Sequence, residues 1–274
     1  MKASEFDYAR PGTLDEALAL MSDDARDVMA LAGGQSLMPM MNFRLAAPDM
    51  LIDLGGLGEL RGIEERDGII RVGAMTRYAE IAAYPGLAEK LPLVAMALPH
   101  VAHSAIRNRG TLGGSIALAD PAAEMPAVLT ALGAVIRLRS LAGERAVAAG
   151  DFFLGLYETA RETGELVTSI DVPIAGPDDL FAFHELTRRH GDYAMAGVAI
   201  ARQDALRIVF FSVSDRPVRA AAAEAVLTED PEAIGAASEA LDDIDFVGDL
   251  NGEAATKRHL AGVVLRRAWA EARG

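Results

Sequence analysis

Two short stretches with adjacent glycines constrain the fold of this chain more than any other feature. Residues 32–36 read AGGQS and follow the apolar run 28–31, and residues 111–115 read TLGGS. Glycine lacks a Cβ atom, so neighbouring N–H groups can turn toward one point and form a concave anion site. A single glycine pair often only closes a turn, but two such stretches suit a ligand with two linked phosphates.

The length and composition predict a soluble protein with about two domains. Of its 274 residues, 51% are hydrophobic, which is enough for a sizeable core. No apolar run is long enough to span a bilayer, and the first residues lack the apolar segment of a signal peptide. We therefore expect a cytoplasmic protein without membrane insertion.

Cysteine content and charge exclude several classes of function. The chain has no cysteine, which rules out disulfides, iron–sulfur ligation and thiol nucleophiles within it. A net charge of −14 disfavours nucleic-acid binding, which needs clustered lysine and arginine. Neither the Rossmann glycine motif nor the P-loop motif occurs, and no nucleophile elbow supports hydrolase chemistry. An anion site would therefore use backbone N–H groups with help from hydroxyls.

The hydrophobic pattern predicts an α+β fold. Alternating or short apolar runs predict strands at residues 6–8, 28–32, 51–54, 60–64, 69–72, 134–139, 166–172, 181–186, 196–202 and 206–213. Helical spacing predicts helices after the capping residue Thr13 and at 76–81, 91–103, 126–132, 220–227, 232–241 and 253–272. The strands and helices do not alternate as regular βαβ units, which favours α+β over a doubly wound sheet. Residues 174–179 are the best candidate for a domain boundary.

Several basic side chains have both a functional and a structural interpretation. His100 and His103 stand three apart on a predicted helix, as two metal ligands would, but no third ligand is patterned nearby. The alternative is a helix end that faces solvent or a subunit. Arg107 and Arg109, just before the second glycine stretch, either supplement the anion site or make surface ion pairs worth little.

The acidic and aromatic candidates also have two interpretations. Asp120 and Glu124 are four residues apart, so helical spacing would place them on one face as an acid–base pair. Carboxylates near a helix N-terminus are also common structural features. Tyr193 suits a stacking platform for a planar ring, although the residues alone favour a half-buried strand position.

Three motifs together resemble the FAD-binding medium subunit of molybdenum hydroxylases, the family of carbon monoxide dehydrogenase and xanthine dehydrogenase flavoprotein subunits. They are AGGQSLMP from Ala32, IRNRGTLGGSIALADPAAEMPA from Ile106, and RRHGDYA from Arg188. The resemblance covers nearly the whole chain. It implies a vanillyl-alcohol-oxidase (PCMH)-type fold over 1–175, with subdomains at about 1–55 and 56–175 that clasp FAD. Residues 176–274 would form a C-terminal α+β domain with a small antiparallel sheet and helices.

The resemblance implies a set of cofactor-binding residues and no catalytic or metal-ligating ones. The set is Ala32, Gly33, Gly34, Gln35, Ser36, Leu37, Thr111, Leu112, Gly113, Gly114, Ser115, Asp120, Glu124 and Tyr193. Within it, Glu124 matches the acid that contacts the ribityl–ribose region, and Tyr193 the residue that lies against the isoalloxazine. Departures from the family pattern occur at Leu118, Asn42 and residues 104–105, where the family often has histidine, a basic residue and Pro-Gln.

The implied function is electron transfer in a multi-subunit oxidoreductase. The chain would take electrons from a [2Fe–2S] small subunit and pass them to an external acceptor, while a molybdopterin large subunit hydroxylates the substrate. The expected assembly is a dimer of heterotrimers. Two other functions remain open from the residues alone: a stand-alone flavin oxidase or dehydrogenase, and a nucleotide-binding regulatory module. The sequence defines neither the organic substrate nor the terminal acceptor.

Overall fold

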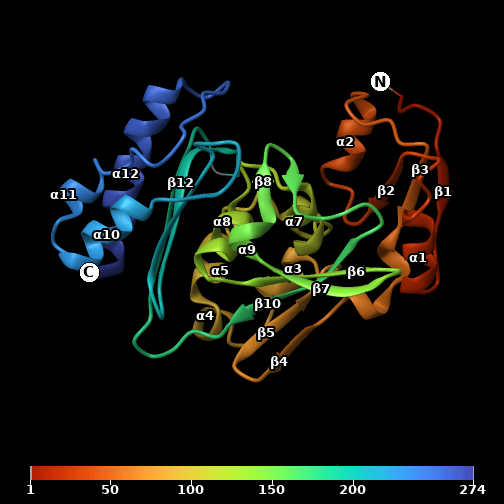
Figure 1. Cartoon of the computed structure of the whole chain (residues 1–274), viewed down its shortest axis with the longest axis horizontal. Helices are drawn as coiled ribbons and strands as arrows, with labels where there is room; N and C mark the ends of the chain where they lie inside the picture. Colours follow the sequence, from red (N-terminus) through yellow and green to blue (C-terminus); the bar gives the residue numbers. More distant parts are fainter. Residues whose placement is uncertain (1, 190, 274) are drawn as a thin grey trace.

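The computed structural model describes residues 2–189 and 191–273, and its mixed helices and sheets confirm the α+β class. Three units follow one another across the molecule, from the N-terminal unit through a central sheet to the C-terminal sheet and helices (Figure 1). Among the described residues, no helix is both long and apolar enough to cross a bilayer.

The N-terminal unit is a parallel three-stranded sheet in the order β1-β3-β2. Its strands are β1 (Asp7–Ala9), β2 (Val28–Leu31) and β3 (Met50–Asp53), and its helices are α1 (Leu14–Met21) and α2 (Leu37–Asn42). Two 3-10 turns follow, at Leu54–Gly56 and Gly58–Leu60. The predicted capping box is confirmed, because the Thr13 hydroxyl accepts from the Glu16 N–H at the start of α1. Strand β2 is only half-buried, which leaves its carboxyl end accessible.

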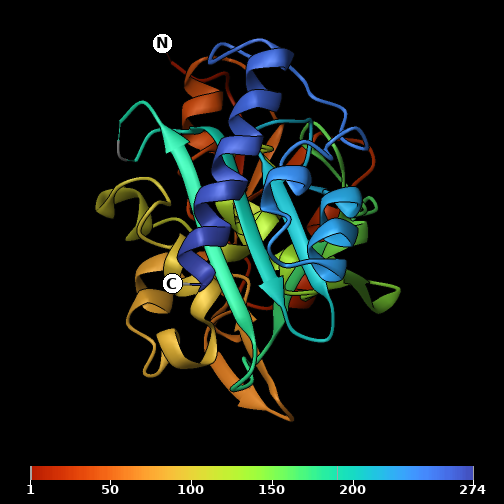
Figure 2. The same cartoon turned by 90° about the vertical axis from the view of Figure 1, so that its left-hand side faces the viewer.

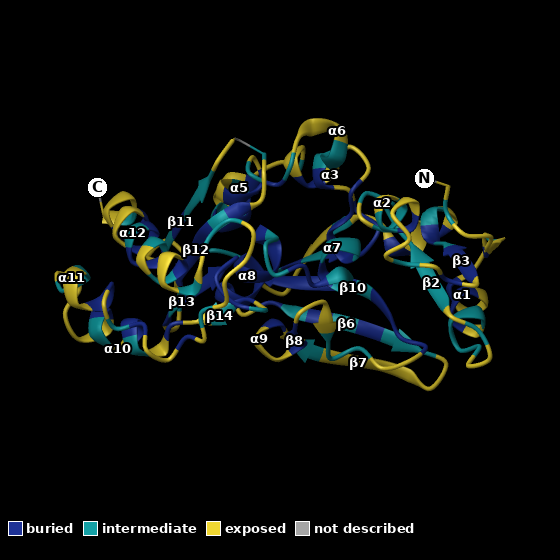
Figure 3. Ribbon diagram, turned by 90° about the horizontal axis from the view of Figure 1, so that it is seen from above, coloured by how far each residue is buried: buried dark blue, intermediate teal, exposed yellow. Residues whose placement is uncertain are grey.

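The central unit is an antiparallel five-stranded sheet in the order β4-β5-β10-β6-β7. Its strands are β4 (Ile63–Arg66), β5 (Ile69–Gly73), β10 (Leu166–Pro173), β6 (Val135–Ser140) and β7 (Gly143–Ala148). The predicted hairpin between β4 and β5 is confirmed, and its two turn residues, Asp67 and Gly68, have positive φ. A separate small antiparallel ribbon pairs β8 (Phe153–Gly155), which is labelled in Figure 3, with β9 (Glu158–Thr159).

The helices of the central unit are mostly short. They are α3 (Tyr78–Ala82), α4 (Leu87–Lys90), α5 (Pro92–Ala97), α6 (Ser104–Arg107), α7 (Leu112–Leu118), α8 (Glu124–Ala131) and α9 (Ala149–Phe152). The prediction of one helix over 91–103 is wrong, since α5 ends at Ala97. Pro99 explains this end, because it has no N–H to donate and it restricts the residue before it. His100 and His103 therefore do not share a helix face, and His103 instead precedes α6.

The C-terminal unit is an antiparallel sheet in the order β11-β12-β13-β14. Its strands are β11 (Leu180–Thr187), β12 (Ala194–Arg202), β13 (Leu206–Phe211) and β14 (Val218–Arg219). Its helices are α10 (Ala221–Glu229), α11 (Ile234–Ala237) and α12 (Ala254–Arg273), and the last of these runs along the strands (Figure 2). Of the helix predicted over 232–241, the structure contains only the single turn α11.

Both faces of the C-terminal sheet are buried. Alternate residues such as Phe183 and Phe211 enter the core of the central unit, where α5 and α8 contact the sheet. The residues between them, such as Ile208 and Phe210, pack under α10 and α12. This sheet is therefore a wall shared by two cores.

Candidate functional site

The first glycine stretch connects β2 to α2 and presents unbonded backbone donors. Gly34 has a φ of +70°, a conformation that glycine adopts without strain. The N–H groups of residues 33–37 donate no hydrogen bond within the described part of the chain. Gln35 folds back so that its Nε2 donates to the Gly33 carbonyl at 3.1 Å. Residues 33–37 therefore supply a run of amides of the kind that binds phosphate oxygens.

The two glycine stretches lie against each other. A Cβ at Gly33 would lie 2.3 Å from the carbonyl oxygen of Arg109, and a Cβ at Gly114 would lie 3.3 Å from the Cβ of Ala32. Side chains at these positions would push the two backbones apart. The two stretches therefore lie side by side, as a single binding site would require.

The second stretch differs from the first, because it begins a helix. Thr111 caps α7, and the backbone N–H groups of the next four residues all donate hydrogen bonds. The N–H groups of Leu112 and Gly113 donate to the carbonyls of Thr76 and Ala74. Those of Gly114 and Ser115 donate to the hydroxyl and the carbonyl of Thr111. The expectation of a second amide nest is therefore wrong. Gly113 instead allows α7 to approach the Ala74 backbone, and Leu112 is buried in the core. What this stretch can offer to a ligand is the Ser115 hydroxyl.

A buried hydroxyl without a partner faces this second stretch. Tyr78, on α3, is 4% exposed, and its hydroxyl makes no hydrogen bond to any described residue. Burial raises the pKa of the Tyr78 phenol, on which Ser115 and Glu124 also act. Ser115 acts on this phenol through its side chain and lowers the pKa, so the Tyr78 and Ser115 hydroxyls form a polar spot beside the second stretch.

Two buried carboxyls, Asp120 and Glu124, follow α7 in the sequence. Asp120 lies in the loop before α8 and is 8% exposed, and its Oδ1 accepts from the Ala122 N–H at 2.9 Å. Glu124 is the first residue of α8 and is 7% exposed. The predicted placement of both on one helix face is wrong, since Asp120 precedes the helix. Burial, with the negative charges of Glu185 and Asp120, raises the pKa of Glu124 to about 7.

Tyr193 lies outside the strand that follows it and is exposed. It precedes β12 and is 62% exposed, so the half-buried strand interpretation is wrong. Partial burial of the phenol end, together with the nearby Asp120, raises its pKa. Tyr157, in the turn between β8 and β9, also lies near Asp120 and is 54% exposed. The sequence carried no signal for Tyr157, because nothing local distinguishes it from an ordinary turn tyrosine.

The other residues that the sequence singled out have contacts that indicate a structural role. The Arg107 guanidinium donates to the carbonyls of Val101 and Ala102 at 2.9 and 2.8 Å, which ties down its own loop. No group of metal-ligating side chains occurs in residues 2–189 and 191–273. Asn42 and Leu118 end α2 and α7, so these departures from the family pattern leave the free amides of residues 33–37 intact.

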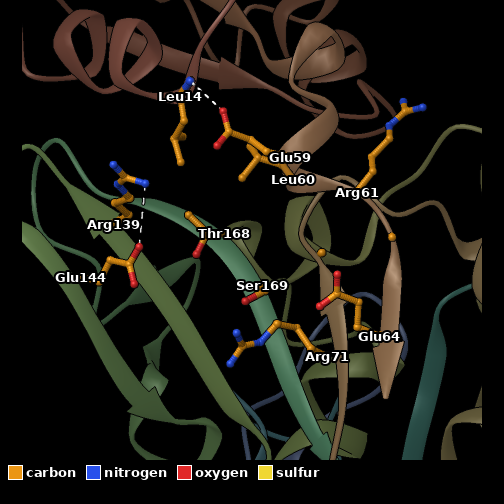
Figure 4. Close-up of a pocket in the computed structure, with 12 residues that line it drawn as sticks. Leu14, Glu59, Leu60, Arg61, Glu64, Arg71, Arg139, Glu144, Thr168 and Ser169 are labelled. Carbon is orange, nitrogen blue, oxygen red and sulfur yellow. Dashed lines mark hydrogen bonds and ion pairs between the residues drawn. The ribbon is translucent and has the colours of Figure 1, made fainter. Parts of the chain in front are cut away.

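An open pocket of ≈ 220 Å³ lies elsewhere, between the N-terminal unit and the central sheet (Figure 4). Two of the arginines that line it already have carboxylate partners, since Arg139 lies beside Glu144 and Arg71 against Asp171. None of its lining residues belongs to either glycine stretch. Residues 33–37, whose backbone donors are unbonded, are therefore the candidate ligand site.

Two family models match the chain. The FAD binding domain in molybdopterin dehydrogenase matches residues 4–175, and the CO dehydrogenase flavoprotein C-terminal domain matches residues 181–272. The nicotine 6-hydroxylase medium subunit of Paenarthrobacter nicotinovorans is 38% identical over 99% of each chain. The carbon monoxide dehydrogenase medium chain of Afipia carboxidovorans is 37% identical over 98% of this chain and 96% of the relative.

Two solved structures match along the whole chain. Carbon monoxide dehydrogenase from Hydrogenophaga pseudoflava has a TM-score of 0.94 at 38% identity, covering 100% of this chain and 99% of that one. Quinoline 2-oxidoreductase from Pseudomonas putida 86 has a TM-score of 0.92 at 37% identity, covering 99% and 98%. Sequence and fold therefore agree on the same group of proteins.

Proposed function

This chain belongs to the family of FAD-binding subunits of molybdenum hydroxylases, and from that premise we propose that it carries FAD and transfers electrons in a multi-subunit oxidoreductase. It takes electrons from a [2Fe–2S] subunit and passes them to an external acceptor. A molybdopterin subunit hydroxylates the organic substrate. The observation that carries the proposal is the run of unbonded amides at residues 33–37, packed against the second glycine stretch.

The residues of the site fit FAD by their chemistry. The amides of residues 33–37 hold the pyrophosphate, because they are the free donors of the site. Ser115, the Tyr78 hydroxyl and Glu124 form a polar middle that suits the hydroxyls of the ribityl and ribose groups. The exposed ring of Tyr193 is available to lie against the isoalloxazine. The domain limits of 1–175 and 176–274 belong to the same proposal.

The role of the protein in this chemistry is to bind FAD and to orient it. When bound, FAD supplies an electron store that exchanges one or two electrons. The amides would stabilise the negative charge of the pyrophosphate by donating hydrogen bonds, and Tyr193 would limit access to the ring. No side chain of this chain needs to act as an acid or base toward the organic substrate, which is handled by another subunit.

Purification of the chain alone tests the proposal. We expect a flavin spectrum, release of FAD on acid precipitation, and dye reduction after chemical reduction of the protein. Turnover of an organic substrate by this chain alone would instead support the stand-alone oxidase, and a colourless protein that takes up no FAD would support the regulatory module. Cell fractionation checks the proposed cytoplasmic location.

A further inference from the structure

Lys257 on α12 is a buried cation that binds the start of strand β12, close in the sequence to Tyr193. Its Nζ donates to the carbonyls of Met195 and Ser212, at 2.7 Å each, and to Asp249 Oδ2 at 2.9 Å. An ammonium group has three protons to donate, so each of them has an acceptor here. Buried ion pairs often add little net stability compared with apolar residues of the same volume. A lysine at this position therefore suits a role in fixing geometry.

Lys257 binds where the regular ladder of the C-terminal sheet stops. The pairing of β12 with β13 begins at Gly197, which lies opposite Phe211. The register of β12 against β11 shifts at Met195, which is the extra residue of a β-bulge. A bulge releases backbone groups from the ladder and bends the strand. The Met195 carbonyl accordingly accepts from a side chain, that of Lys257.

Ser212 connects this end of the sheet to the segment of Asp120. Its φ is +60°, a conformation that residues other than glycine rarely adopt, and it is buried. The Ser212 N–H donates to the carbonyl of Pro121 at 2.8 Å, and its hydroxyl donates to the carbonyl of Ala194. Pro121 follows Asp120, and Ala194 follows Tyr193. One residue therefore binds the neighbours of both candidate cofactor contacts.

The backbone, rather than the ring, therefore holds Tyr193 in place. Because Tyr193 is largely exposed, its side chain has little packing to fix it. The next two residues are bound by the Ser212 hydroxyl and by Lys257. The same two side chains meet at the Ser212 residue itself, whose carbonyl accepts from Lys257. Loss of either donor would let the segments of Tyr193 and Asp120 move relative to each other.

We propose that Lys257 and Ser212 are positioning residues for the flavin end of the site. They fix the segments of Tyr193 and Asp120 in one arrangement, so that the Tyr193 ring is held against the isoalloxazine. The proposal rests on the proposed function, because that function assigns Tyr193 to the ring. Lys257 and Ser212 act through the backbone of residues 194–195 and 121.

Hydrogen exchange on the FAD-free full chain tests the positioning without the cofactor. Ser212→Ala removes one hydroxyl, and the amides of residues 192–196 should exchange about two- to tenfold faster, as expected for one lost hydrogen bond. Lys257→Met should have the same effect there and at residues 212–215. Val264→Ala is the control, because Val264 lies on the same helix and is buried in the apolar core beside the sheet. It should lower the melting temperature and leave both segments as in the wild type. Wild-type exchange in Ser212→Ala and Lys257→Met overturns the proposal, and Ser212→Ala alone decides if Lys257→Met does not fold.

Flavin measurements test the link to the cofactor. At equal FAD content, Ser212→Ala and Lys257→Met should change the visible circular dichroism of the flavin and speed its reoxidation, because the Tyr193 ring covers it less. Val264→Ala should change neither. In a Tyr193→Ala background, Ser212→Ala should have no further effect on reoxidation, since it acts through Tyr193. An unchanged flavin in both variants, or an effect as large without Tyr193, overturns the proposal while FAD binding stands. Absence of FAD from the wild type contradicts the proposed function, on which the positioning role depends.

Discussion

Gly33 has no side chain because the carbonyl oxygen of Arg109 lies where its Cβ would be, at 2.3 Å. Gly33→Ala should separate the two glycine stretches, at about 1–3 kcal/mol of overpacking. Since the free amides belong to the same stretch, FAD affinity should fall by about tenfold or more. Gly150→Ala is the matched control, because a Cβ there would meet nothing within 4 Å. Titration of apoprotein with FAD measures both, and wild-type affinity in Gly33→Ala would contradict the assignment.

Tyr193 is 62% exposed, so its ring contributes little to folding. Tyr193→Ala should change stability by no more than about 0.5 kcal/mol, as surface substitutions do. The flavin spectrum and the rate of reoxidation should change, because the ring is assigned to the isoalloxazine. Tyr193→Phe should behave as the wild type if stacking matters rather than the hydroxyl. A large loss of melting temperature with an unchanged flavin would remove Tyr193 from the site.

Glu124 links stability to pH. Its folded pKa, raised to about 7, exceeds the ordinary 4.5, so the folded state binds more protons between these values. The protonated Glu124 contributes ~3 kcal/mol to the free energy of unfolding below pH 4.5. This contribution is lost as the pH rises through about 7. Glu185 raises the pKa of His100, which acts in the same direction. Urea unfolding of FAD-free protein should show Glu124→Gln gaining on the wild type as pH rises from 5 to about 8. A constant difference would contradict the raised pKa.

At the scale of elements, a buried lysine fastens the longest helix to the C-terminal sheet. Lys257 on α12 is 0% exposed, and its Nζ donates to Met195 O, Ser212 O and Asp249 Oδ2 at 2.7, 2.7 and 2.9 Å. Lys257→Met should cost about 1–3 kcal/mol for each buried carbonyl that loses its donor, whereas Asp249, which is 43% exposed, remains solvated. Lys90→Met is the control, since its pair with Glu65 is partly exposed and worth at most about 1 kcal/mol. Equal losses in both variants would show that α12 is held by apolar packing alone.

Local patterns predicted the strands well and the polar networks poorly. The strands of the C-terminal sheet alternate between two cores, so their period of two is visible in the sequence. The helix predicted over 91–103 failed, because hydrophobic spacing was given more weight than Pro99. Both glycine stretches were found, but whether their amides are free depends on partners such as Thr76 and Ala74. The pairing of His100 with Glu185 joins residues far apart in the chain, so no local pattern reveals it.

At the scale of the whole molecule, the C-terminal sheet belongs to two cores. One face, with Phe183, Val209 and Phe211, completes the central core beside α5 and α8. The other face packs under α10 and α12. The family models divide the chain between residues 175 and 181, in the connection from β10 to β11. This division in sequence therefore does not correspond to a division of the apolar core.

A truncated chain of residues 1–175 tests this consequence. Without β11–β13, the apolar surfaces of α5 and α8 lose their cover, and an exposed patch of that kind favours aggregation. We expect the fragment to be insoluble or to bind a hydrophobic dye strongly, although it retains both glycine stretches. Co-expression with residues 176–274 should restore solubility and FAD content, because the missing face of the sheet is supplied in trans. Size-exclusion chromatography with absorbance in the flavin band measures both. A monomeric 1–175 fragment that binds FAD as tightly as the full chain would show that the N-terminal region completes its own core, and the shared-wall description would then be wrong.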